Sequence, residues 1–312
     1  MNNSDLEKSI LKTIAYFDIF QYPLTSLEVY KWLFLPEKNY TFIETLKTLD
    51  NLVLADQIQK KFGFYFLPQQ SQNVKIRLER YYLAEKKFKI ALFVIARLGW
   101  FSNIKNISIC NNVGYNNAQA QSDIDFFIII RAGHLWFSRL LITLITSILM
   151  LRRHAKEIAN RACLSFYLAD DHYDISDIAL NPPDIYLIYW LATLAPVYDQ
   201  DSYLDFLKAN DWQKKYLPNF YPVKMSCRRR YVHSQNQFFK KINFKLFTFK
   251  TGGWLEKTSK ILQRQKMKGH FHSGHTGTEV VITDSMLKFH ENDRRRQYYQ
   301  TWQAKLKDLN LI

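Results

Sequence analysis

Two aspartates separated by a single residue, Asp123 and Asp125, are the side chains of this sequence best suited to chemistry. They open the run Asp-Ile-Asp-Phe-Phe-Ile-Ile-Ile, which predicts a buried β-strand. Side chains two positions apart project from the same face of a strand, so both carboxylates are expected to meet near its start. Mg²⁺ accepts one or two protein carboxylates together with phosphate oxygens, and it is the cation that such a pair predicts. The alternative interpretation is a solvated strand end.

The segment Ser122-Asp123-Ile124-Asp125-Phe126 resembles the signature of the nucleotidyltransferase superfamily, which includes DNA polymerase beta and the minimal nucleotidyltransferases. The resemblance covers roughly residues 101–170. It implies Mg²⁺-dependent transfer of a nucleotidyl group from a nucleoside triphosphate to a hydroxyl acceptor. It also implies that Asp123 and Asp125 hold the Mg²⁺ as catalytic residues, and that Ser122 lines the phosphate site.

Two positions depart from the pattern of that family. The family has Gly-Ser or Gly-Gly at the head of a short helix, and the matching position here is Asn111-Asn112. Asparagine tolerates left-handed backbone and caps helices, so Asn111 and Asn112 are assigned to the phosphate site. A later strand supplies a third carboxylate in the family, but the β-prone run 163–168 contains none. Asp170 and Asp171 follow this run, and Asp170 is assigned as the third catalytic residue.

These departures leave two further functions open. One is a catalytically inactive relative that binds nucleotide or nucleic acid. The other is a winged-helix regulator in which the part of the chain around the aspartates serves as a scaffold. A third carboxylate within reach of Asp123 and Asp125 is the feature that separates catalysis from binding alone.

The elements that must position the aspartates form a small α/β unit. We expect a strand over residues 104–109, a polar loop over 110–122 and a second strand over 123–130. An apolar helix over residues 135–152 and a third strand over 163–168 follow. A buried helix over residues 184–194 continues the unit. We therefore expect an α+β fold whose small mixed-sheet core, similar to a nucleotidyltransferase domain, covers residues 101–210.

Residues 1–70 are predicted to form a winged helix, joined to the core by a connecting helix over residues 71–100. The pattern is three helical segments followed by two strand-like runs around Lys60-Lys61. The third helical segment carries Lys47 against Glu44 and Asp50. A DNA-reading helix presents net positive charge to phosphates, so packing or protein binding is favoured over DNA binding.

Residues 211–312 are predicted to form a basic, helical C-terminal region. Within them, residues 222–268 hold thirteen Lys and Arg side chains against one acid, Glu256, with aromatic residues interleaved. This composition favours contact with single-stranded nucleic acid, where bases stack and phosphates pair with cations. An anionic lipid surface and a solvated basic face are the alternatives. The charged stretch 287–296 is expected to be a solvated helix face.

The composition of the whole chain sets further limits. Hydrophobic residues make up 47%, as in folded domains, and the net charge of +15 favours anionic partners. Three widely spaced cysteines offer no disulfide framework, and no signal peptide is evident at the start of the sequence, which together predict a cytoplasmic protein. The apolar run at residues 140–151 is shorter than the roughly 20 residues that span a bilayer, so no membrane span is expected.

Overall fold

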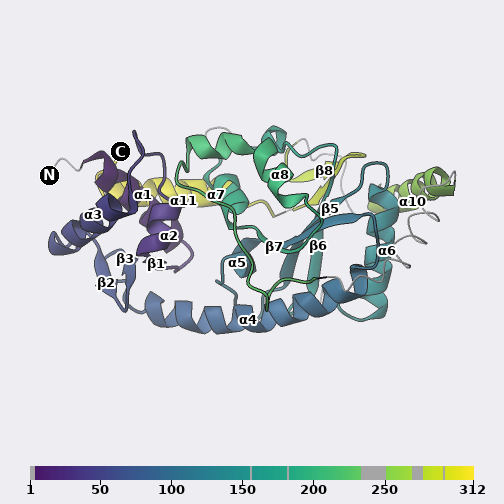
Figure 1. Cartoon of the computed structure of the whole chain (residues 1–312), viewed down its shortest axis with the longest axis horizontal. Coiled ribbons are helices and arrows are strands. Elements are labelled where there is room, and N and C mark those ends of the chain that lie inside the picture. Colours follow the sequence, from purple (N-terminus) through teal and green to yellow (C-terminus); the bar gives the residue numbers. More distant parts are fainter. Residues whose placement is uncertain (1–3, 155–156, 181–182, 233–250, 269–276, 291) are drawn as a thin grey trace.

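The computed structural model describes the chain except for residues 1–3, 155–156, 181–182, 233–250, 269–276 and 291. A helical unit with a small sheet lies at one end, and a larger mixed sheet covered by helices lies at the other (Figure 1). The long helix α4, Asn73–Leu98, runs between the two parts. Its 26 residues extend about 39 Å at the usual rise of an α-helix.

The N-terminal unit contains three helices, α1 (Asp5–Asp18), α2 (Ser26–Lys31) and α3 (Phe42–Leu54). Each begins with a capping box in which a Ser or Thr hydroxyl and a Glu three residues later satisfy backbone N–H groups. Strands β1 (Leu24–Thr25), β2 (Gln59–Lys61) and β3 (Phe64–Phe66) form an antiparallel sheet in the order β1-β3-β2. The expected three helices followed by a hairpin are therefore present.

The larger sheet has six strands in the order β7-β4-β5-β6-β9-β8. Strands β5 and β6 are parallel, and all the other pairs are antiparallel. The strands are β4 (Ile104–Ile109), β5 (Ile124–Ile130), β6 (Ala162–Ala169), β7 (Ala195–Asp199), β8 (Val280–Ile282) and β9 (Met286–Phe289). The mixed sheet confirms the coarse fold class, and β4, β5 and β6 match the three expected strands.

Alternation along β5 divides the core into two layers. Ile124, Phe126, Ile128 and Ile130 pack in one cluster with side chains of α4 and of α6 (Leu135–Ile148). Phe127 and Ile129 pack in another cluster with α7 (Ile185–Thr193) and α8 (Tyr203–Ala209). The sheet is therefore buried on both faces, and Asp125 belongs by parity to the face that α7 covers.

The C-terminal part of the chain does more than form helices. Helix α10 (Thr251–Lys268) contacts α6, whereas β8 and β9 extend the sheet beyond β6. Helix α11 (Arg295–Asp308) then returns to the N-terminal unit, so that both chain ends lie on the same side (Figure 1). There the Trp302 indole N–H donates to the Lys12 carbonyl at 3.0 Å.

Strands β7, β8 and β9 were not expected from the sequence. The stretch 287–296 was expected to be a solvated helix face, and this was wrong. Residues 287–289 belong to β9 with Lys288 buried, and the next buried cation of the stretch is Arg295. Its side chain is 6% exposed because it pairs with Asp184 at 2.7 Å and with Asp293 at 2.7 Å. The 18 residues 233–250 of the expected nucleic-acid-binding segment lie outside the described residues.

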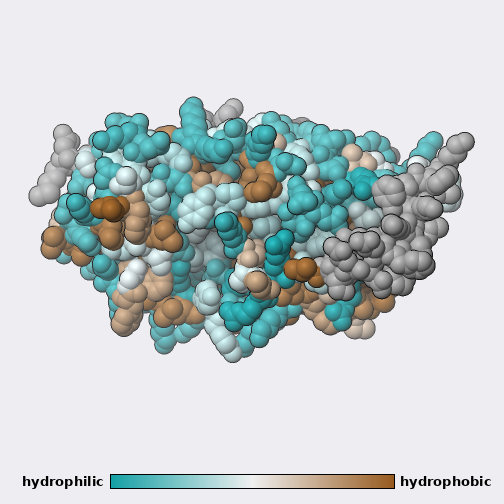
Figure 2. Space-filling model, in the orientation of Figure 1, coloured by the Kyte–Doolittle hydropathy of each residue, from teal (hydrophilic) through white to brown (hydrophobic). Residues whose placement is uncertain are grey.

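None of the helices in the described ranges has the length and apolar character that a bilayer crossing requires. Hydrophilic residues dominate much of the face seen in Figure 2, with smaller apolar patches between them.

Candidate functional site

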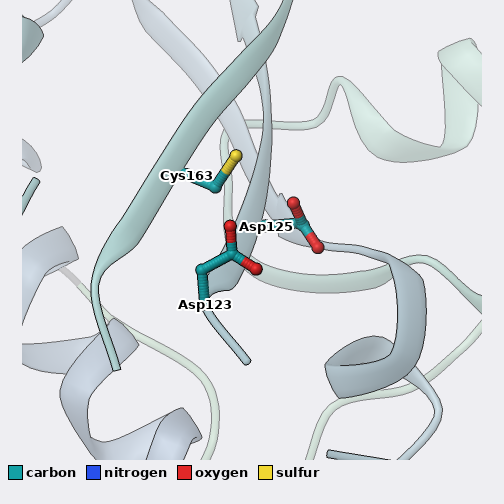
Figure 3. A group of neighbouring side chains, drawn as sticks. All are labelled: Asp123, Asp125 and Cys163. Carbon is teal, nitrogen blue, oxygen red and sulfur yellow. The ribbon is translucent and has the colours of Figure 1, made fainter. Parts of the chain in front are cut away.

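Asp123 and Asp125 lie at the start of β5, the strand that pairs with β6. Asp123 immediately precedes the strand, and Asp125 is its second residue and pairs in register with Cys163 of β6. One ligand atom from each of Asp123, Asp125 and Cys163 falls within 4.8 Å of the other two (Figure 3). The two carboxylates therefore meet, as their spacing predicts, and a thiol is the third group beside them.

The environment of Asp125 disfavours its charge. Burial raises the pKa of Asp125 to about 6, and the nearby charge of Asp123 acts in the same direction. Hydrogen bonds with the side chains of Asn111 and Cys163 oppose this rise in pKa. The hydrogen bonds to Asp125 thus offset only part of the effect of burial and of the Asp123 charge. A cation bound beside the two carboxylates would offset more of it.

Asp123 has a partner of opposite charge. Its carboxylate lies 2.7 Å from a guanidinium nitrogen of Arg153, and the side chains are 14% and 46% exposed respectively. An ion pair with so exposed an arginine is worth at most about 1 kcal/mol. Displacement of the Arg153 guanidinium from Asp123 by a bound cation therefore costs little free energy.

Lys87 of α4 holds the loops that carry these groups, and the sequence analysis missed it. Its side chain is buried, and Nζ donates to the Ser122 carbonyl at 2.7 Å and to Asn160 Oδ1 at 2.8 Å. Ser122 precedes β5 and Asn160 precedes β6, so one ammonium group ties the starts of both strands to α4. Lys87 shares a helical face with the buried Ala84, Phe88 and Ala91, which is the signal that could have identified it.

The residues assigned to the phosphate site separate in the structure. Asn111 has a φ of 54°, the left-handed conformation that favours glycine, and its side chain accepts a hydrogen bond from the Tyr186 hydroxyl at 2.9 Å. The Asn112 side chain instead accepts from the Tyr115 hydroxyl at 2.7 Å. The Ser122 hydroxyl donates to the Gln119 carbonyl within its own loop. Asn111 alone of the three thus directs its side chain to the aspartates.

Asp170 is not brought to the aspartate pair, which corrects its assignment as the third carboxylate. It follows β6, its backbone N–H donates to the Ile130 carbonyl, and its carboxylate accepts from the Ala132 N–H at 2.8 Å. Because β5 and β6 are parallel, the five residues from Asp125 to Ile130 separate the two ends by about 17 Å. Asp171, the neighbouring candidate, follows the same end of β6. Within the described ranges, Cys163 occupies the place opposite Asp125, and burial raises the pKa of its thiol well above the ordinary range.

A cavity of about 510 Å³ opens beside Asp125, and we call it the arginine cavity. Its polar lining consists of Asp125, Arg139, Arg152, Arg153, His154, Cys163, Ser165, His290 and Asn292. Asp125 is the one acidic side chain among the described residues of this lining. Arg139 and Arg152 form no ion pair with any described residue. Burial and the charge of Arg152 lower the pKa of Arg139, as expected for crowded cations without an anion.

His290, which follows β9, lies in the wall of the arginine cavity. Its Nε2 is 3.3 Å from the Ser165 hydroxyl, and its Nδ1 is buried without a hydrogen-bond partner in the part of the chain that the structure describes. Burial, assisted by the charge of Lys288, lowers the pKa of His290 to about 4. Arg295 acts in the same direction, whereas Asp293 opposes it. The imidazole is therefore neutral at physiological pH.

Comparisons with protein-family models, curated proteins and solved structures find no match to this chain.

Replacement of Lys87 by methionine should lower the free energy of unfolding by about 2 kcal/mol, because Ser122 and Asn160 would lose their hydrogen-bond donor in a buried place. Urea unfolding followed by fluorescence measures this difference. Lys89→Met is the matched control, since Lys89 is exposed on the same helix, and its effect should stay within about 0.5 kcal/mol. Equal effects of the two substitutions would contradict the role given to Lys87.

The lowered pKa of His290 predicts a pH dependence of stability. In the unfolded chain the imidazole takes up a proton below its ordinary pKa of 6.5, whereas in the native protein it does so only near 4. The native state therefore loses stability as pH falls from 6.5 towards 4. His290→Gln does not titrate, so relative to this variant the parent protein should lose about 2 kcal/mol between pH 7 and pH 5. Parallel urea titrations that show a constant difference at both pH values would exclude this effect.

Proposed function

We propose that this chain binds a nucleoside triphosphate with Mg²⁺ at Asp123 and Asp125 and transfers its nucleotidyl group to a hydroxyl acceptor. The observation that carries the proposal is the pairing of two adjacent carboxylates with a cavity rich in arginine. Carboxylates beside phosphate-binding cations are the arrangement that a Mg²⁺–triphosphate complex requires.

The donor set fits Mg²⁺. Asp123 and Asp125 offer carboxylate oxygens, the ligands that Mg²⁺ prefers, and the arginine cavity beside them leaves room for phosphate oxygens and waters. Burial and the nearby charge of Asp123 raise the pKa of Asp125, and a cation between the two carboxylates would offset both effects. Cys163 is a soft donor and adds little for Mg²⁺. A bound Mg²⁺ supplies charge neutralisation at the phosphates and orientation of the attacking hydroxyl.

The residues of the chain have separate tasks in this proposal. Arg139 and Arg152, which lack partners of opposite charge among the described residues, pair with phosphate oxygens. The left-handed backbone at Asn111 allows close approach of the ligand, and Lys87 keeps Asp123 in place. In the transfer step the acceptor oxygen bonds to the α-phosphorus, the bond to pyrophosphate breaks, pyrophosphate leaves with the electron pair, and the hydroxyl proton passes to water.

The finer assignment of the fold belongs to the same proposal. Strand β4, the short helix α5 (Asn111–Gly114), β5, α6 and β6 follow one another in the order expected for a nucleotidyltransferase-like core. Helices α1 to α3 with the β2–β3 hairpin support a winged helix. In that unit Lys60 is paired with Asp50 at 3.3 Å, which supports a packing or protein-binding role over DNA contact.

A second candidate is nucleotide binding without transfer. It is favoured by the thiol of Cys163 opposite Asp125, where a third carboxylate would complete a catalytic set, and by the distant position of Asp170. The phosphate-binding role of the arginine cavity is the same in both candidates.

The double substitution Asp123→Asn/Asp125→Asn should weaken Mg²⁺-dependent binding of a nucleoside triphosphate at least tenfold, because both metal ligands lose their charge. Calorimetry with ATP, CTP, GTP and UTP in Mg²⁺ measures this loss. Asp170→Asn is the control and should leave binding unchanged. If the parent protein binds none of the four nucleotides, the proposal fails. Release of pyrophosphate with a single-stranded RNA as hydroxyl acceptor then distinguishes transfer from binding alone.

Arg152→Gln should weaken binding of both a nucleoside triphosphate and inorganic tripolyphosphate by about tenfold, since a charged hydrogen-bond donor to phosphate is lost. Arg97→Gln removes an exposed arginine of α4 outside the cavity and should change neither affinity. Equal losses in the two variants would show that the net charge of the protein, rather than the cavity, attracts the ligand.

A further inference from the structure

A second cavity, of about 200 Å³, lies between α7, β6 and the segment that joins β9 to α11. Four aromatic side chains line it, and we call it the aromatic cavity: Phe166, Tyr186, Trp190 and Tyr298. Its remaining described lining residues are mostly polar and come largely from residues 288–295. Of the residues given a task in the proposed function, Asn111 alone lines this cavity.

The four rings are arranged as two stacked pairs. Tyr186 and Trp190 are four residues apart on α7, so both project from one face of the helix. Tyr298 of α11 stacks on Tyr186 with ring centroids 5.4 Å apart and planes at 18°. Phe166 of β6 stacks on Trp190 at 5.5 Å and 28°. Paired rings give flat, apolar walls that suit a planar heterocycle.

The cations of the aromatic cavity are mostly engaged, in contrast to those of the arginine cavity. Lys288 Nζ donates to the Thr278 carbonyl at 2.6 Å, and Arg295 pairs with both Asp184 and Asp293. The exposed Arg294 is the one cation of this lining without an ion pair to a described residue. A phosphate therefore finds fewer cations without an ion pair here than beside Arg139 and Arg152.

Apart from Arg294, the groups that remain for a ligand are neutral. Asn111 and Asn292 offer amides, and His290 offers an uncharged imidazole whose Nδ1 has no hydrogen-bond partner in the described ranges. Amides and a neutral imidazole both donate and accept hydrogen bonds. These groups therefore suit the polar edge of an uncharged ring better than they suit an anionic ligand.

The two cavities share lining residues beside the carboxylate site. His290 and Asn292 line both of them, and Asn111, whose side chain bonds with Asp125, lines the aromatic cavity. Asp125 also shares its face of β5 with Phe127, which packs against Trp190. The stacked rings and the arginines are therefore neighbours of the same carboxylate site.

We propose that the aromatic cavity holds the base of a nucleoside triphosphate whose phosphates lie in the arginine cavity. This assignment rests on the proposed function, and it makes Tyr298 a residue that distinguishes nucleotides from inorganic polyphosphate. The walls contribute stacking, and Asn111, Asn292 and His290 contact the edge of the base.

The test compares two probes on the full chain in Mg²⁺, a nucleoside triphosphate and inorganic tripolyphosphate. Tyr298→Leu should weaken binding of the nucleotide about tenfold or more, because stacking on the base is lost. Its affinity for tripolyphosphate should change less than twofold. Tyr298→Phe keeps the ring and should bind both probes as the parent protein does. Tyr299→Leu is the matched control on the same helix, since Tyr299 does not line the aromatic cavity.

Four results would overturn the inference. Unchanged nucleotide binding by Tyr298→Leu places the base elsewhere, and parallel loss of both probes shows a general structural effect. A parent protein that binds tripolyphosphate as tightly as every nucleotide has no base site, although its phosphate site stands. A parent protein that binds neither probe refutes the proposed function together with this inference, so the two failures are distinguishable.

Discussion

The burial of β5 on both faces is the constraint on which the site depends. Every residue of this strand except Asp125 is buried, so the strand can carry a carboxylate only at its entry, where a cavity admits solvent or ligand. The parallel register with β6 then places Cys163 opposite Asp125 and sends Asp170 to the far end. Two parallel strands must be joined by a crossover connection, and α6 forms it between β5 and β6. Arg152 and Arg153 lie in the segment that leads from α6 to β6.

The sequence was sufficient to predict the helices and strands whose apolar residues recur with a clear helical or strand period. It was insufficient to predict the elements that depend on tertiary contacts. Strands β4, β5 and β6 and helices α6 and α7 were predicted because their apolar patterns are strong. Strand β7 follows α7 after a single residue and continues its apolar composition, so no local signal separates the two. Strand β9 contains Lys288, which is buried by contacts with Thr278 and Glu279 that only the folded chain brings together.

The same difference holds within the site. The convergence of Asp123 and Asp125 follows from strand geometry, and the left-handed backbone of Asn111 agrees with the tolerance of asparagine for that conformation. The place of Asp170 could not be predicted, because it depends on the direction of β6 relative to β5. Lys87 was overlooked because a lysine on a helix is usually solvated. Its burial is explained by the three oxygen atoms that accept from its ammonium group, two backbone carbonyls and one side-chain amide, and only the folded chain brings these together.

The basic side chains of this protein fall into two groups with different consequences. Lys87, Lys288 and Arg295 are buried with their donors satisfied, so they fix loops and helices and contribute little field to a ligand. Arg139 and Arg152 have no acidic partner among the described residues and face the same cavity as Asp125. A positive net charge alone predicts anionic partners without locating them. The absence of an acidic partner for these two arginines among the described residues is the more local feature, because an anion in the arginine cavity would gain charge pairing that the described part of the chain does not provide.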